Sequence, residues 1–153
     1  TQPADHRGHR RQIRGQGMDT LKTVLSVAAS GMRAQGERLK VVSENVANAS
    51  STGNASGDDP YRRKIISFQE MVDRDSGASM VEVDRIRRDD ADFQLNYDPS
   101  HPAADEDGFV KVSNVNTILE MSNMREASRS YQANLNMFET GRTMRSQLLD
   151  LLK

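Results

Sequence analysis

The sequence predicts an α+β protein in which two long terminal helices enclose a small β-rich insert. Apolar residues recur at helical spacing over the last forty or so residues, where Val115 to Leu152 holds no proline and one glycine. A stretch near the amino end has apolar residues at alternating spacings of four and three. Between the two, alternating apolar and polar residues are typical of strands. We therefore expect the helices to form a coiled-coil-like hairpin with the insert between them.

The composition is that of a single domain with limited core material. The chain has 153 residues, of which 35% are hydrophobic and 28% charged, and its net charge is −1. No apolar run approaches the roughly 18 residues of a membrane span. The near-neutral charge argues against nucleic acid as the main partner. The absence of cysteine excludes a disulfide scaffold and any thiolate metal or nucleophile site.

Residues 1–17 contain Arg7, Arg10, Arg11 and Arg14 but almost nothing apolar. We interpret them as a disordered basic leader or as an over-called start upstream of Met18. A basic arm for phosphate or membrane is the functional alternative. No apolar region follows the arginines, so the segment does not have the pattern of a secretory signal peptide.

Residues 18–52 predict the first helix, with Asp19 or Thr20 capping its start. Gly31 and Gly36 each weaken an isolated helix by about 1 kcal/mol relative to alanine, but such small residues let another backbone approach closely. We call its heptad stripe, together with the apolar stripe of the second helix, the helix seam. In the first helix the seam comprises Leu21, Leu25, Ala28, Met32, Gln35, Leu39, Val42, Val46 and Ala49.

Residues 53–113 predict a loop and a small β insert. The region from Ala49 to Pro60 is rich in serine, glycine, asparagine and aspartate, as loops are. Asp107-Gly108 is a turn signal before the last strand. Strand-like patterns cover Ile65 to Met71, Val81 to Val83, Phe93 to Tyr97 and Phe109 to Val112.

Residues 114–153 predict the second helix, which begins in a capping box made by Thr117 and Glu120. At about 1.5 Å per residue it would be roughly 50 Å long, more than a domain of this size easily buries. Its seam positions are Met121, Met124, Ala127, Tyr131, Leu135, Phe138, Met144, Leu148 and either Leu151 or Leu152. A stripe of this length predicts a partner helix.

No residue set predicts catalysis, a cofactor or a metal site. The acidic runs at 89–92 and 105–107 lack the closing glutamate of a calcium loop, so we interpret them as solvated loops. His101, the one histidine beyond the leader, has no serine or acid in a recognisable triad order. We expect no enzyme activity and no cofactor.

Two separated motifs resemble a known family. Ser30 to Gln35 (SGMRAQ) followed by Ser43 to Asn48 (SENVAN) resembles the amino-terminal signature of the flagellar rod, hook and hook-filament axial proteins. Asn114 to Thr117 (NVNT), followed by Glu120-Met121 and by Arg129 to Asn134 (RSYQAN), is similar to their carboxy-terminal signature.

The resemblance covers Met18 to Lys153. Pro60 to Arg63 (PYRR), together with Phe68 and the short insert, is most similar to the proximal rod proteins of the C type within that family. The serine-rich loop from Ala49 to Gly57 is longer than the family pattern.

The resemblance implies a structural subunit of the proximal rod of the bacterial flagellar basal body. Such a subunit assembles with itself and with other rod proteins, through its terminal helices, into a helical tube that transmits torque and conducts exported subunits. Its expected partners are other flagellar rod proteins, the rod-base adaptor, copies of itself and the flagellar export apparatus. Its expected place is the periplasmic rod, which it reaches unfolded through type III export without a cleaved signal peptide.

A helical tube needs two different contact faces on each subunit. Val24, Val41 and Met137, which lie off the seam, are candidates for the second face. The assembly interface that we expect comprises Leu21, Leu25, Met32, Leu39, Val42, Val46, Asn48, Tyr131, Asn134, Leu135, Phe138, Leu148 and Leu152.

Two other functions remain open. A soluble helical-hairpin binding module or chaperone-like protein would use the seam within one chain and would fold stably alone. That account would leave off-seam valines, such as Val24 and Val41, exposed to water. An enzyme with a site in the insert would need a nucleophile, base or metal set that the sequence does not offer.

Overall fold

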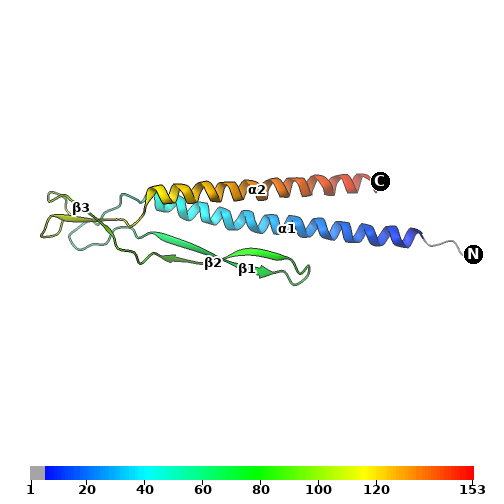
Figure 1. The fold of residues 1–153 in the computed structure, drawn as a ribbon, viewed down its shortest axis with the longest axis horizontal. Helices are drawn as coiled ribbons and strands as arrows, with labels where there is room; N and C mark the ends of the chain where they lie inside the picture. Colours follow the sequence, from blue (N-terminus) through cyan, green and yellow to red (C-terminus); the bar gives the residue numbers. More distant parts are fainter. Residues whose placement is uncertain (1–5) are drawn as a thin grey trace, which may run out of the picture.

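The computed structural model describes residues 6–153 and confirms the α+β class. Helix α1 (His6–Ala47) and helix α2 (Thr117–Asp150) lie side by side in an elongated molecule (Figure 1). Strands β1 (Lys64–Val72) and β2 (Ser79–Arg88) form an antiparallel hairpin that runs along α1. Strands β3 (Gln94–Tyr97) and β4 (Phe109–Val112) form a second antiparallel pair beyond the ends of the helices.

Helix α1 begins at His6, twelve residues before the predicted start at Met18, and ends at Ala47. The prediction of a separate leader over residues 1–17 therefore differs from the structure from His6 onward, and residues 1–5 lie outside the described part. No proline occurs between Pro3 and Pro60, and arginine and glutamine are good helix formers, so the helical pattern continues through the basic segment. At the other end the Asn48 side chain donates to the carbonyl of Glu44 at 2.8 Å.

Helix α2 begins with a different cap from the one predicted. The side chain of Asn116 accepts hydrogen bonds from the backbone amides of Ile118 and Leu119 at 3.1 and 3.2 Å. Thr117 is the first helical residue, and Glu120 is completely buried in an ion pair with Arg63. The predicted capping box is therefore wrong, because asparagine is itself a strong N-cap and Glu120 has a buried cationic partner.

The two helices are antiparallel and approach closely where the sequence has small residues. A Cβ atom at Gly31 would lie 2.6 Å from the side-chain nitrogen of Asn134. A Cβ atom at Gly141 would lie 2.9 Å from a methyl carbon of Leu25. Gly31 thus makes room for the side chain of Asn134, whereas nothing lies within 4 Å of the corresponding point at Gly36.

Helix α1 lies between α2 and the β1–β2 hairpin and contacts both (Figure 1). Its buried residues accordingly form two rows. One row belongs to the helix seam and includes Leu21, Ala28 and Val42. The other consists of Ser30, Ala34, Val41 and Asn45, spaced by four, seven and four residues. Because Val41 is buried, the prediction that it supplies an outer contact face is wrong.

The β3–β4 pair is tied to the loop that leaves α1. Thr52 forms an isolated bridge with Val112, and the amide of Ser113 donates to the carbonyl of Ser51 at 3.0 Å. Val110 and Val115 are buried beneath this pair. The strand begins at Gln94, one residue later than predicted, and the guanidinium of Arg62 lies 4.1 Å from the ring centroid of Phe93.

Candidate assembly interface

Most residues of the expected interface are covered within a single chain. Leu21 and Val42 are buried, and Leu152, which follows α2, is exposed. The remaining ten are partly buried: Leu25, Met32, Leu39, Val46, Asn48, Tyr131, Asn134, Leu135, Phe138 and Leu148. The helix seam therefore first joins α1 to α2, and any contact with another molecule has to use other surfaces as well.

One such surface is an apolar stripe on α2. Met137 and Met144 lie seven residues apart on one side of the helix, and Leu151, seven residues further on, is its C-cap. Their exposed fractions are 55%, 49% and 78%, so the prediction that Met144 and Leu151 belong to the helix seam is wrong. The prediction that Met137 is available for an outer contact agrees with this exposure. We call these three residues the α2 stripe.

A second exposed apolar surface lies on the β3–β4 pair. Leu95 and Tyr97 alternate along β3 and therefore share a face, and Tyr97 is paired directly with Phe109. The rings of Tyr97 and Phe109 meet edge to face, with centroids 5.4 Å apart. All three side chains are exposed, at 63%, 65% and 40%. We call these residues the β3–β4 patch.

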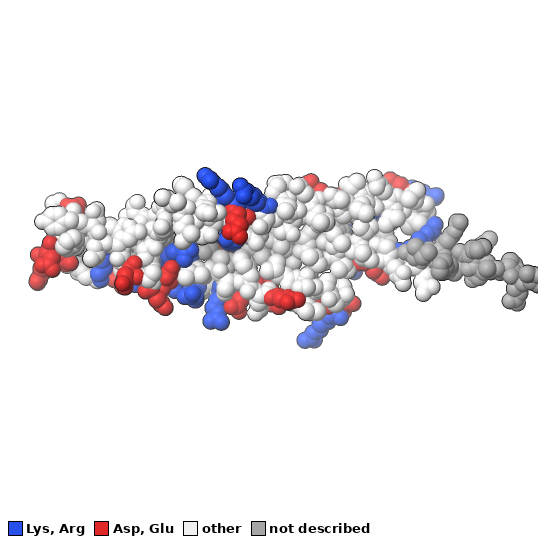
Figure 2. Space-filling view, in the orientation of Figure 1, with Lys and Arg blue, Asp and Glu red and all other residues white. Residues whose placement is uncertain are grey.

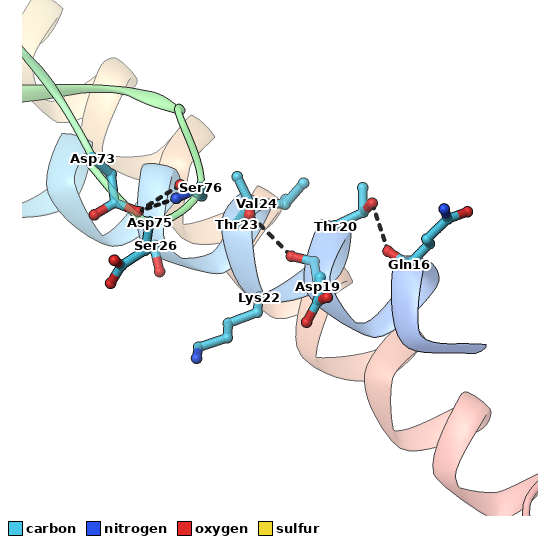
Figure 3. A pocket seen from close by; sticks show the side chains of 10 residues that line it. All are labelled: Gln16, Asp19, Thr20, Lys22, Thr23, Val24, Ser26, Asp73, Asp75 and Ser76. Carbon is cyan, nitrogen blue, oxygen red and sulfur yellow. Dashed lines mark hydrogen bonds between the residues drawn. The ribbon is translucent and has the colours of Figure 1, made fainter. Parts of the chain in front are cut away.

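The groove between α1 and the tip of the β1–β2 hairpin is open and polar (Figure 3). Within α1, Thr20 donates to the carbonyl of Gln16 and Thr23 to that of Asp19. Within the hairpin turn, Ser76 donates to Asp73, and these hydrogen bonds lower the pKa of the Asp73 carboxyl. The hydrogen bonds drawn in Figure 3 therefore stay inside each element, and the hairpin tip is only loosely held.

The root of the hairpin is held far more firmly, by side chains that we call the polar junction: Asn45, Arg63, Asp89, Asn114 and Glu120. Asn45 lies two residues before the end of α1 and is 1% exposed. Its Oδ1 accepts hydrogen bonds from the amide of Lys64 at 2.9 Å and from the hydroxyl of Tyr61 at 2.8 Å. Its Nδ2 donates to the carbonyl of Lys64 at 2.9 Å. The side chain of Asn45 thus forms, with both backbone groups of Lys64, the hydrogen bonds that a neighbouring strand would form at the start of β1.

Arg63 is the centre of the polar junction. Its Nε donates to Oε1 of Glu120, and its Nη1 donates to Oδ2 of Asp89 at 3.2 Å. Burial acts to lower the pKa of Arg63, but the hydrogen bonds and charges of Glu120 and Asp89 raise it overall. A hydrogen bond from the amide of Ala91, assisted by Arg63, lowers the pKa of the Asp89 carboxyl. Arg63 therefore keeps its positive charge at neutral pH.

Asn114 completes the junction from the segment before α2. Its Oδ1 accepts from the amide of Arg63 at 2.7 Å, and its Nδ2 donates to the carbonyls of Asp89 and Ala91 at 3.2 and 3.0 Å. The backbone and side chain of Arg63 are thus both fixed.

The polar junction was not predicted from the sequence. Glu120 was interpreted as part of a helix cap and Asp89 as part of a solvated loop, and both interpretations are wrong. The available signal was the placing of Asn45, Arg63, Asn114 and Glu120 inside the segments that carry the resemblance. Nothing in their spacing shows that they meet.

The other polar residues considered from the sequence serve local structure. Nδ1 of His101 accepts from the amide of Ala103 at 3.0 Å. Oδ1 of Asp105 accepts from the amides of Asp107 and Phe109, which closes the turn before β4. Acidic side chains gather at the end of the molecule where β3 lies (Figure 2).

Within residues 6–153, no group of three histidine or acidic side chains is arranged to hold a metal ion. Neither described helix has a stretch that is both long and apolar enough to cross a membrane.

Two family models match the chain. Residues 25–55 match the model described as flagella basal body rod protein. Residues 106–151 match that of the flagellar basal body rod FlgEFG protein C-terminal region. Both long helices therefore fall at least partly within matched segments.

Curated relatives match almost the whole chain. The flagellar basal-body rod protein FlgC of Agrobacterium fabrum is 48% identical over 136 residues, which are 89% of this chain and 98% of the relative. The FlgC of Salmonella typhimurium is 37% identical over 86% of this chain and 97% of its own length. That of Bacillus subtilis is 35% identical over 84% and 96%.

Proposed function

Because the chain belongs to the FlgC family of flagellar basal-body rod proteins, we propose that its terminal helices form part of the wall of a helical tube. The chain is a structural subunit of the flagellar basal-body rod. The finer proposal places it in the proximal rod, where the tube transmits torque and conducts exported subunits. It acts there without enzymatic activity.

The observation that supports this proposal is the apolar surface left over after the chain has folded. The α2 stripe and the β3–β4 patch lie on different elements and are both exposed. Large exposed apolar groups on a folded chain mark contact sites. Two unlike surfaces suit the head-to-tail contacts of an open helical assembly, in which a face of one subunit meets a different face of the next.

The helix seam has a supporting role in this proposal. Its buried and partly buried members, such as Leu21, Leu39 and Val42, hold α1 against α2 as a coiled coil, and so present the α2 stripe in a fixed direction. Leu39→Asp would place a charge in the seam and would prevent assembly by separating the helices. The partly buried position of Leu39 supports this role.

The proposed partners are copies of the chain, other rod proteins, the rod-base adaptor and the flagellar export apparatus. The subunit would reach the periplasmic rod unfolded, through the type III export channel, without a cleaved signal peptide. The helices suit this route because their closest contacts, such as Gly31 with Asn134, join residues far apart in sequence. An incomplete chain therefore lacks half of each contact.

The test is a substitution in the α2 stripe that leaves the folded chain intact. Met144→Asp, expressed in a flagellated bacterium lacking its own copy of this rod protein, should abolish swimming at a normal protein level. Ser146→Asp is the matched control, since Ser146 is also exposed on α2 but lies off the stripe, and it should swim normally. Normal swimming by Met144→Asp would contradict the proposal.

The covering of the seam within one chain favours a second candidate, a soluble helical-hairpin binding or chaperone-like module. The two candidates differ in where the protein is found. Immunoblotting of purified basal bodies should detect a rod subunit even after washing in high salt. A soluble module would remain in the supernatant.

A further inference from the structure

We infer that the Arg63–Glu120 ion pair is a positioning site, which fixes the direction in which the β1–β2 hairpin leaves the helix pair. Arg63 immediately precedes β1, and Glu120 lies in the first turn of α2. The pair therefore joins the root of the hairpin to α2, while Asn45 joins the same root to the last turn of α1. Three segments far apart in sequence meet there.

The hairpin behaves as a lever that is held at this root. β1 has nine residues, which at about 3.3 Å each make a strand of about 30 Å. A rotation of about 10° at the root would move the tip by about 5 Å on that length. Farther out, the hairpin packs along α1, and the amide of Val81 donates to the hydroxyl of Ser30 at 3.4 Å. At the tip the hydrogen bonds stay within each element (Figure 3).

The chemistry of the junction is better suited to fixing a direction than to adding stability. A buried ion pair contributes little net stability compared with apolar side chains of the same volume, because both charges lose their water. Its geometry is directional, however, since the planar guanidinium presents separate N–H groups to two carboxylates. Arg63 uses Nε for Glu120 and Nη1 for Asp89, which fixes the plane of its side chain.

The consequence for assembly depends on the proposed function. A subunit in a tube has to present its insert at the same angle as its neighbours. A hairpin that swings at its root would therefore block incorporation, even when both helices remain folded. Replacing the ion pair as a whole is thus expected to change the position of the hairpin more than the stability of the fold.

The experiment measures the hairpin position directly. The chain has no cysteine, so cysteines introduced at the exposed Arg74 in the hairpin turn and the exposed Arg142 on α2 can each take a spin label. Pulsed electron paramagnetic resonance then gives the distribution of distances between the labels in the full chain. Thermal unfolding, followed by circular dichroism, is measured on the same samples.

The key variant is the apolar pair Arg63→Met with Glu120→Leu. Its unfolding temperature should equal or exceed that of the parent, while its distance distribution should broaden. Glu120→Gln and Arg63→Lys should also broaden the distribution, because each keeps a polar group but loses part of the paired geometry. Swimming should be lost in the apolar pair although it remains folded.

Glu126→Gln is the matched control. Glu126 also pairs with an arginine, Arg38, at 3.2 Å, but that pair joins α1 to α2 without touching the hairpin, and Glu126 is 67% exposed. Its distance distribution should remain that of the parent.

Several outcomes would overturn the inference. A narrow, unshifted distribution in the apolar pair would show that packing alone positions the hairpin. A broad distribution in the parent would show that the junction does not hold it. Failure of all three junction variants to fold, even in the cold, would assign the pair to folding instead of position. Failure of the assembly proposal is distinguishable, because Met144→Asp would then swim while the junction variants still broaden the distribution.

Discussion

The two ends of the helix pair are held together by different chemistry. Where α1 ends and α2 begins, the buried Asn45 and Glu120 and the partly buried Arg63 form hydrogen bonds within the junction and to the insert. Toward the termini the helices meet where Gly31 faces Asn134 and Gly141 faces Leu25, and the exposed Leu151 follows the end of α2. The polar junction lies within one chain, whereas the terminal end of α2 keeps exposed apolar side chains such as Met137 and Met144. Along α2, therefore, the buried polar contacts and the exposed stripe lie at opposite ends, while the β3–β4 patch lies beyond the junction end.

The largest effect should follow from breaking the junction. Glu120→Ala leaves the partly buried Arg63 without its fully buried partner, which should lower the free energy of unfolding by about 3 kcal/mol. Glu126→Ala removes an exposed carboxylate from the other ion pair and should cost less than about 1 kcal/mol. Urea unfolding of the two variants measures the difference. Equal losses of unfolding free energy in the two variants would show that the junction pair stabilises the chain no more than the exposed pair does.

The next effect concerns the small-residue contact farther along the helices. Gly31→Val would place its side chain against Asn134 and should destabilise the chain by about 1–3 kcal/mol through overpacking. Adding Asn134→Ala should restore part of this loss. Gly36→Ala, which meets nothing within 4 Å, should instead stabilise the helix by about 1 kcal/mol. Thermal unfolding of the series would contradict the packing account if Gly31→Val and Gly36→Ala behaved alike.

A smaller effect tests the start of α2, beside the junction. Asn116→Ala removes the side chain that caps two backbone amides and should cost about 1 kcal/mol. Thr117→Ala should be close to neutral, because Thr117 does not cap the helix. The unfolding midpoints of the two variants decide between the observed cap and the capping box expected from sequence.

The smallest effect on stability should come from the terminal end. Leu151→Gln changes a side chain that is mostly exposed and should alter the free energy of unfolding by less than about 0.5 kcal/mol. Its effect should appear instead as poorer incorporation into purified basal bodies, measured by immunoblotting. A substantial loss of stability with normal incorporation would show that Leu151 serves the fold of the chain and not its assembly.

The parts of the fold that follow from periodicity were predicted from the sequence. The two helices and the strands have local patterns that depend on a period of 3.6 or 2. The second buried row of α1 was missed because Ser30, Ala34, Val41 and Asn45 mix polar and apolar types. Their common burial depends on the hairpin that covers them.

The candidate site also has one part that could be predicted from the sequence and one that could not. The helix seam could be read from spacing, whereas the polar junction unites residues 45, 63, 89, 114 and 120 through tertiary structure. Glu120 had a plausible local partner in the capping box, and only the fold reveals the competing partner, Arg63. Local pattern cannot decide between two acceptable hydrogen-bonding choices for one side chain.

The start of α1 and the end of α2 lie at the same end of the molecule (Figure 1), although α1 comes before the insert in the sequence and α2 after it. Each contact between them closes a very long loop, and proteins rich in such non-local contacts fold slowly. A chain emerging amino end first would have no second helix to pair with until nearly its final residue had arrived. Completion of the chain, and not the rate of local helix formation, then sets when the subunit becomes competent to join its neighbours.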